Sequence, residues 1–124
     1  GKIVAPGFID PHTHSGVSAV NESGFAIVPE VQMGDVITHN NIWFYRQLAG
    51  GLTTTMIKHG SANPIGGENV YVKTRWGSLP DDYRIEGAPR TVKFTRRNPP
   101  RPAKACFCAL VIASTANSAS APVM

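Results

Sequence analysis

Two candidate strands enclose one candidate helix in the first half of the chain, and this order restricts the fold more than any other feature. Residues 8–14, FIDPHTH, and residues 52–60, LTTTMIKHG, are short runs rich in apolar or β-branched side chains. Between them, THNNIWFYRQLAGG has apolar residues at helical spacing, Thr38 or Asn40 as N-cap, and Gly50-Gly51 as a stop. A strand, helix, strand order begins a βαβ unit, so we predict a parallel strand pair and an α/β fold.

Shorter elements are predicted on either side of this unit. Residues 17–37 have no clear period and are predicted to be irregular, with one strand near FAIVPEV. The stretch GSANPIGG at 60–67 lacks the lysine that ends a phosphate-binding P-loop, so we interpret it as a tight strand-to-helix connection. Three more short strands are predicted, at IVA (3–5), around Val70 and Val72, and at RTVKF (90–94).

The positive charge of the chain is concentrated in its last third. Residues 1–86 hold eight acidic and six basic residues, whereas residues 87–124 hold six basic residues and no acidic one. From residue 95 the sequence is basic and rich in Pro, Ala and Ser, which is typical of a disordered tail. Phe107 is the one aromatic residue there, so the tail lacks the stacking surfaces of a single-strand nucleic-acid binder, and we do not expect a nucleic-acid partner.

Cysteine content and hydropathy argue against a cysteine-based scaffold and against a membrane-spanning protein. Cys106 and Cys108 form a C-x-C pair rather than a disulfide framework, and this spacing is shorter than that of thiolate zinc sites. The longest apolar run, at 105–113, is about half of the roughly 20 residues that a membrane helix needs. We expect no membrane partner and a cytoplasmic location; because the chain opens with Gly1, an upstream signal peptide stays open as the alternative.

The histidines of PHTH, His12 and His14, are the first candidates for chemistry. In a strand, residues two apart point to the same face, so both imidazoles can share one metal ion. The alternative is a pair of exposed histidines at a strand end. Asp10, two residues before His12, either supports the ligands by hydrogen bonding or caps the turn.

Two longer segments carry a family resemblance. GKIVAPGFIDPHTHSG resembles the junction in the metal-dependent amidohydrolase superfamily where a small β-sandwich leads into strand 1 of the catalytic barrel. LAGGLTTTMIKHGSANPIGGENVYVKTRWG (48–77) and GAPRTVKF (87–94) are similar to the imidazolonepropionase-like branch. The resemblance covers about residues 1–94 and ends at Phe94, where the sequence departs from the family.

The resemblance implies an architecture. Residues 1–7 would be the end of the β-sandwich, residues 8–94 the start of a (β/α)8 TIM barrel, and residues 95–124 a tail that is disordered or out of frame. A complete barrel needs about 250 residues, twice the 124 of this chain, so we expect a partial barrel.

The resemblance also implies a chemistry, the hydrolysis of an amide or cyclic amide C–N bond in a small molecule by water activated on one or two divalent ions, with zinc the leading candidate. His12 and His14 match the strand 1 ligands. Lys93 is our candidate for a carboxylated lysine bridging two metals and Lys73 the second candidate, against the alternative of ordinary surface lysines.

Of the two other histidines in the chain, one is predicted to contact the substrate. His59 ends the second strand and is the candidate for contacting substrate, against a structural loop histidine; His39, just before the helix, is expected to be structural.

The resemblance does not supply a complete catalytic site. No catalytic acid or base is assigned, since the later family ligands and the proton-transferring aspartate find no match, and we expect the chain alone to be inactive. The competing hypotheses are a binding module whose basic tail contacts an acidic partner, and a product of gene fragmentation. The sequence indicates neither the substrate nor the oligomeric state.

Overall fold

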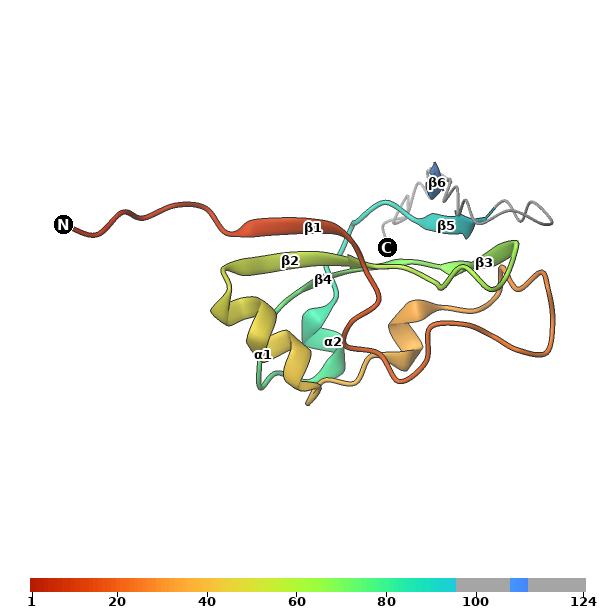
Figure 1. Cartoon of the computed structure of the whole chain (residues 1–124), viewed down its shortest axis with the longest axis horizontal. Helices are drawn as coiled ribbons and strands as arrows, with labels where there is room; N and C mark the ends of the chain where they lie inside the picture. Colours follow the sequence, from red (N-terminus) through yellow and green to blue (C-terminus); the bar gives the residue numbers. More distant parts are fainter. Residues whose placement is uncertain (96–107, 112–124) are drawn as a thin grey trace, which may run out of the picture.

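The computed structural model describes residues 1–95 and, for the backbone, residues 108–111 (Figure 1). The predictions made for the rest of the tail, including those for Cys106 and Phe107, fall outside these residues. The predicted βαβ unit is confirmed. Strand β1 (Phe8–Thr13) pairs in parallel with β2 (Leu52–Ile57), and helix α1 (Ile42–Ala49) lies between them in the chain.

Helix α1 begins and ends through local hydrogen bonds. The N-cap is Asn41 rather than Thr38 or Asn40, because the Asn41 side chain accepts a 3.0 Å hydrogen bond from the Trp43 amide. At the other end, the Gly50 amide donates to the carbonyl of Arg46, and Gly51 adopts a φ of +85°. Within the helix only Phe44 is buried, so one aromatic ring anchors α1 to the sheet.

Two three-stranded sheets form around the βαβ unit. In the first, β4 (Val70–Lys73) joins β2 in antiparallel fashion, giving the order β1-β2-β4. The second has the order β3-β5-β6, from β3 (Ile65–Glu68), β5 (Thr91–Phe94) and β6 (Cys108–Val111), with antiparallel pairing throughout. The strands predicted around Val70 and at 90–94 are confirmed.

The structure also corrects the predictions for GSANPIGG and for residues 3–5. GSANPIGG does not lead into a helix, because its second half belongs to β3, where Ile65 lies opposite Phe94. A side chain at Gly66 or Gly67 would collide with His59 or Val31, so glycine permits this close packing. Residues 3–5 form no strand, because no described segment pairs with them, and Ile3 and Val4 are exposed.

Residues 17–37 are irregular, as expected, but the strand predicted near FAIVPEV is absent, because Ile27 makes only a single bridge there. They contain the short 3-10 helix η1 (Met33–Val36) and touch the sheets through single bridges, such as Ile27 with Ile65. Helix α2 (Pro80–Tyr83) was not predicted.

The hydrophobic core lies on one side of the β1-β2-β4 sheet. It consists of Met33, Phe44, Ile57, Val72 and Tyr83. Figure 1 shows α1 and α2 on this side and β5 on the other. Across the described part of the chain, none of the helices has the length and apolar character to span a membrane.

Candidate metal centre

His12 and His14 stand at the carboxyl end of β1 with their ring nitrogens turned toward each other. Between them, Thr13 is buried and pairs with the core residue Ile57, so side-chain alternation places the two imidazoles on the face opposite Thr13. Their Nε2 atoms are 3.3 Å apart and the ring planes are nearly perpendicular, at 84°. Two nitrogens bound tetrahedrally to zinc at 2.0–2.1 Å are separated by about 3.3 Å, so the pair has the spacing of two zinc ligands.

The His14 ring is oriented by the neighbouring strand. Its Nδ1–H donates a 2.8 Å hydrogen bond to the Lys58 carbonyl, which follows β2. Because a carbonyl only accepts, the proton of the neutral ring lies on Nδ1 and the Nε2 lone pair is free for a metal. Metal-ligating histidines are commonly held in this way through the other ring nitrogen.

The Asp10 side chain binds the main chain at His12. Its carboxylate accepts a 2.9 Å hydrogen bond from the His12 main-chain amide, which corresponds to the turn-capping alternative. Its effect on His12 is also electrostatic: burial lowers the pKa of the imidazole, the positive charges of Lys93 and Lys58 lower it further, and the Asp10 charge opposes them.

Lys93 lies on β5 and is completely buried. Its Nζ has no hydrogen-bond partner among the described residues, although an unpaired buried amine is costly. Its positive charge is one of the influences that lower the pKa of His12, while the hydrogen bonds of His12 and His14 go to Asp10, to Lys58 and to each other. Within the same described part of the chain, no third His, Cys, Asp or Glu completes a metal-binding group with the histidines.

The structure places His59 in a different environment. The side chain is fully buried, its Nδ1–H donates to the Gly60 carbonyl at 3.0 Å, and its Nε2 has no partner among the described residues. It lines a cavity of about 180 Å³ with mostly apolar walls, including Val20 and Met33, and this cavity does not include His12 or His14. His39 is exposed and contributes its carbonyl as an acceptor for Tyr83, a structural contact.

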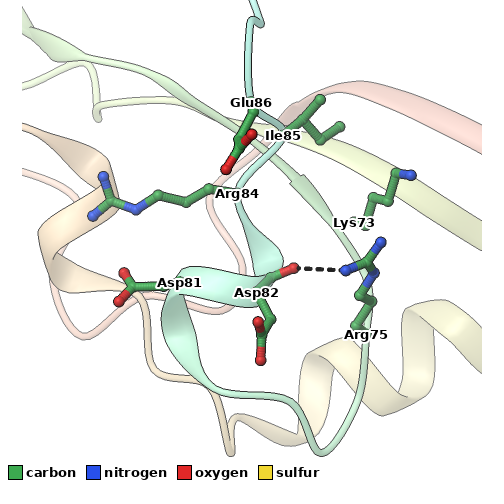
Figure 2. Close-up of a pocket in the computed structure, with 7 residues that line it drawn as sticks. All are labelled: Lys73, Arg75, Asp81, Asp82, Arg84, Ile85 and Glu86. Atoms are coloured by element: carbon green, nitrogen blue, oxygen red, sulfur yellow. Dashed lines mark hydrogen bonds between the residues drawn. The ribbon is translucent and has the colours of Figure 1, made fainter.

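Lys73 does not join the histidines either. It is exposed and pairs with Thr54 in β2, several residues before the end of β2 that lies beside the histidines. There it lines a cavity of about 390 Å³ (Figure 2). The other lining residues are Arg75, Asp81, Asp82, Arg84, Ile85 and Glu86. Figure 2 shows Arg75 directed at the main-chain carbonyl of Asp82, and the 3.3 Å hydrogen bond that Arg75 donates there joins the segment after β4 to α2.

Sequence reasoning missed two buried polar residues next to the candidate centre. Lys58 is 6% exposed and Asn69 likewise 6%. The Asn69 side chain accepts from the His59 amide at 3.1 Å and donates to the Thr91 hydroxyl at 3.0 Å. The available signal for Lys58 was its position directly after the apolar pair Met56-Ile57, at the end of the predicted strand.

The crystal structure of an amidohydrolase from Thermotoga maritima MSB8 is similar to this chain, with a TM-score of 0.62 and 32% sequence identity. The similarity covers 67% of this chain and 24% of that protein, so the chain spans about a quarter of that protein's length. No protein-family model and no curated protein matches. Over the shared segment, the chain resembles an amidohydrolase.

Proposed function

We propose that this chain carries the first metal-binding strands of a hydrolase that cleaves a C–N bond in a small amide or cyclic amide. In this proposal β1, α1 and β2 form the first unit of a (β/α)8 barrel. His12 and His14 hold a divalent metal ion, for which zinc is the best candidate. The observation that carries the proposal is the 3.3 Å approach of the two Nε2 atoms, with His14 held in the ligand tautomer by Lys58.

The donor set agrees with a borderline metal such as zinc. Imidazole nitrogens suit zinc, copper, iron and nickel better than magnesium or calcium, which prefer oxygen ligands. When bound, such an ion supplies a Lewis acid that lowers the pKa of a water molecule and polarises the amide carbonyl. The similarity to an amidohydrolase supports this class of reaction.

Lys93 is the proposed third contributor. Its buried Nζ has no partner in the described part of the chain, and a carbamate bound to a metal ion would be a paired form of this side chain. The neutral amine attacks carbon dioxide, an N–C bond forms and one proton leaves to solvent, so the side chain becomes an anionic carbamate. Such a carbamate would offer its oxygens as further ligands to a metal ion held by His12 and His14.

The described residues around the centre fix the positions of the two histidines, and none of them is assigned to proton transfer. His14 is fixed by the Lys58 carbonyl, and the backbone before His12 is fixed by Asp10. Catalytic zinc normally has three protein ligands and a water, and none of the described side chains is placed as a proton acceptor. We therefore expect the 124-residue chain to bind metal without measurable turnover.

Metal titration of the purified chain tests the proposal. Zinc or cobalt uptake, followed by calorimetry and by the cobalt absorption spectrum, is expected to be lost in His12→Ala and His14→Ala. His39→Ala is the matched control, because His39 is exposed and away from the pair. Equal metal binding in all four proteins would refute the proposed centre.

The lysine is tested separately. We expect native mass spectrometry under added bicarbonate to show a gain of one carbon dioxide that is absent in Lys93→Ala, and metal affinity to fall in that variant. Unchanged metal content in Lys93→Ala would remove Lys93 from the centre and leave the histidines in place.

A further inference from the structure

The cavity beside His59 takes no part in the proposed function. It has a volume of about 180 Å³ and lies between the end of β2 and the irregular segment of residues 17–37. Its wall includes the apolar side chains of Ala19, Val20, Val31, Met33 and Val36. Neither His12 nor His14 belongs to this wall, so the cavity is separate from the histidine pair.

His59 offers this cavity one free hydrogen-bond acceptor. The side chain is fully buried, and its Nδ1–H donates to the Gly60 carbonyl at 3.0 Å. A Cβ on Gly66 would collide with Nδ1, so this edge of the ring packs against β3 and the edge with Nε2 is left to face the cavity. A neutral imidazole protonated on Nδ1 accepts at Nε2, and this nitrogen has no partner among the described residues. A donor placed in the cavity would satisfy it.

The other polar groups of the wall are already paired through their oxygens. The Glu22 carboxylate accepts from the amides of Gly24 and Phe25, both at 2.7 Å. Asn21, which is exposed, accepts from the Ala62 amide at 3.1 Å through its side-chain oxygen. The inner wall therefore presents acceptors and one negative charge, which favours a neutral donor over an anion.

Size and polarity limit what this cavity can hold. A buried water molecule typically makes about three hydrogen bonds to polar groups, whereas most of this wall is apolar. A dry apolar cavity of about 150 Å³ is large enough to bind benzene. The 180 Å³ beside His59 therefore suits one six-membered ring with a small substituent.

We propose that this cavity is a binding site for a small neutral molecule that combines one apolar ring with one hydroxyl or N–H donor, a phenol being the simplest example. The ring packs against Val20 and Met33, and the donor reaches His59 Nε2. The wall is fixed in advance, because the Gly60 amide donates to the Val20 carbonyl. This site is independent of the proposed metal centre and does not rest on the proposed function.

Two matched probes test the inference. Phenol and toluene have nearly the same shape, but only phenol carries a hydrogen-bond donor. We expect phenol to bind to the purified chain and to shift the nitrogen NMR resonance of His59 Nε2, and toluene to leave that resonance in place. The titration is repeated with a metal chelator, which is expected to leave the affinity for phenol unchanged.

Variants separate the acceptor from the space. His59→Leu removes the acceptor and keeps an apolar wall, so we expect the affinity for phenol to fall at least tenfold relative to that for toluene. Val20→Phe fills the cavity with His59 intact and is expected to abolish binding of both probes. Val4→Phe is the matched control, because Val4 is 96% exposed and distant from the wall in the chain.

The outcomes are distinct from those that test the metal centre. The inference is overturned if phenol does not bind, or if its affinity is unchanged in Val20→Phe; the second variant decides the matter even where His59→Leu does not fold. Phenol binding that is lost with the chelator would assign the cavity to the metal site and also refute an independent site.

Discussion

The buried amide of Asn69 connects the two parts of the candidate centre, so its removal is the most informative perturbation. It accepts from the His59 amide at 3.1 Å and donates to the Thr91 hydroxyl at 3.0 Å, while its own backbone amide donates to the Thr91 carbonyl at 2.8 Å. His59 follows Lys58, whose carbonyl holds His14, and Thr91 begins the strand of Lys93. Asn69 therefore ties the histidine side of the centre to the lysine side.

The loss expected from Asn69→Ala follows from these bonds. The His59 amide would be left buried without an acceptor, which costs about 1–3 kcal/mol, and the Thr91 hydroxyl would lose its donor for about 1 kcal/mol more. We expect the free energy of unfolding to fall by roughly 2–4 kcal/mol, measured by urea denaturation. Because residues that support metal ligands typically contribute about 10–100-fold to metal affinity, zinc binding should weaken within that range.

Asn63→Ala is the matched control. Asn63 is also buried, at 2% exposure, and its amide donates to the carbonyls of Glu22 and Phe25 at 2.9 and 2.7 Å. It therefore supports the irregular segment rather than the centre, so its loss should lower stability and leave zinc affinity unchanged. A stability loss below about 0.5 kcal/mol for Asn69→Ala, or equal changes in zinc affinity in both variants, would refute the connecting role.

Two further predictions concern the surrounding fold. Gly16→Ala should destabilise the chain by roughly 2–4 kcal/mol, because Gly16 has a φ of +78° and a Cβ there would collide with the Phe44 ring. Gly77→Ala, at a φ of +90° with open space around it, should cost only about 1–2 kcal/mol, and equal urea midpoints for the two variants would contradict the packing account. The hydrogen bonds from Arg90 hold the pKa of Glu68 below its usual 4.5, so this pair stabilises the fold above that value and the contribution is lost as pH falls through the folded-state pKa. Arg90→Gln should therefore lose less stability on acidification than the unsubstituted chain, and a parallel acid dependence of the two urea midpoints would argue against the pair.

The elements predicted correctly from the sequence are those with local signals. Gly50 and Gly51 end α1 through bonds within four residues, and the β-branched run at 53–55 favours a strand by its own side chains. The elements predicted wrongly depend on distant partners. Residues 65–68 form a strand because β5 lies beside them, and residues 3–5 form none because no described segment does.

The candidate metal centre also combines features that local spacing predicts with features that depend on distant segments. The period of two in a strand was enough to place His12 and His14 on one face, and the structure brings their Nε2 atoms to 3.3 Å. The sequence also singled out Lys93, but its burial comes from the placement of β5. Lys73, the second candidate, is left exposed among other charges by the structure.

By itself, then, the sequence determined the βαβ unit and the paired histidines, because both follow from spacing along one segment. Only the tertiary structure decided which lysines are buried, which carbonyl orients His14, and that Asn69 joins the two sides. These features depend on the register between β1 and β2 and on the contact between Asn69 and β5. Register and contact are set by packing across many residues, so no short stretch of the chain encodes them.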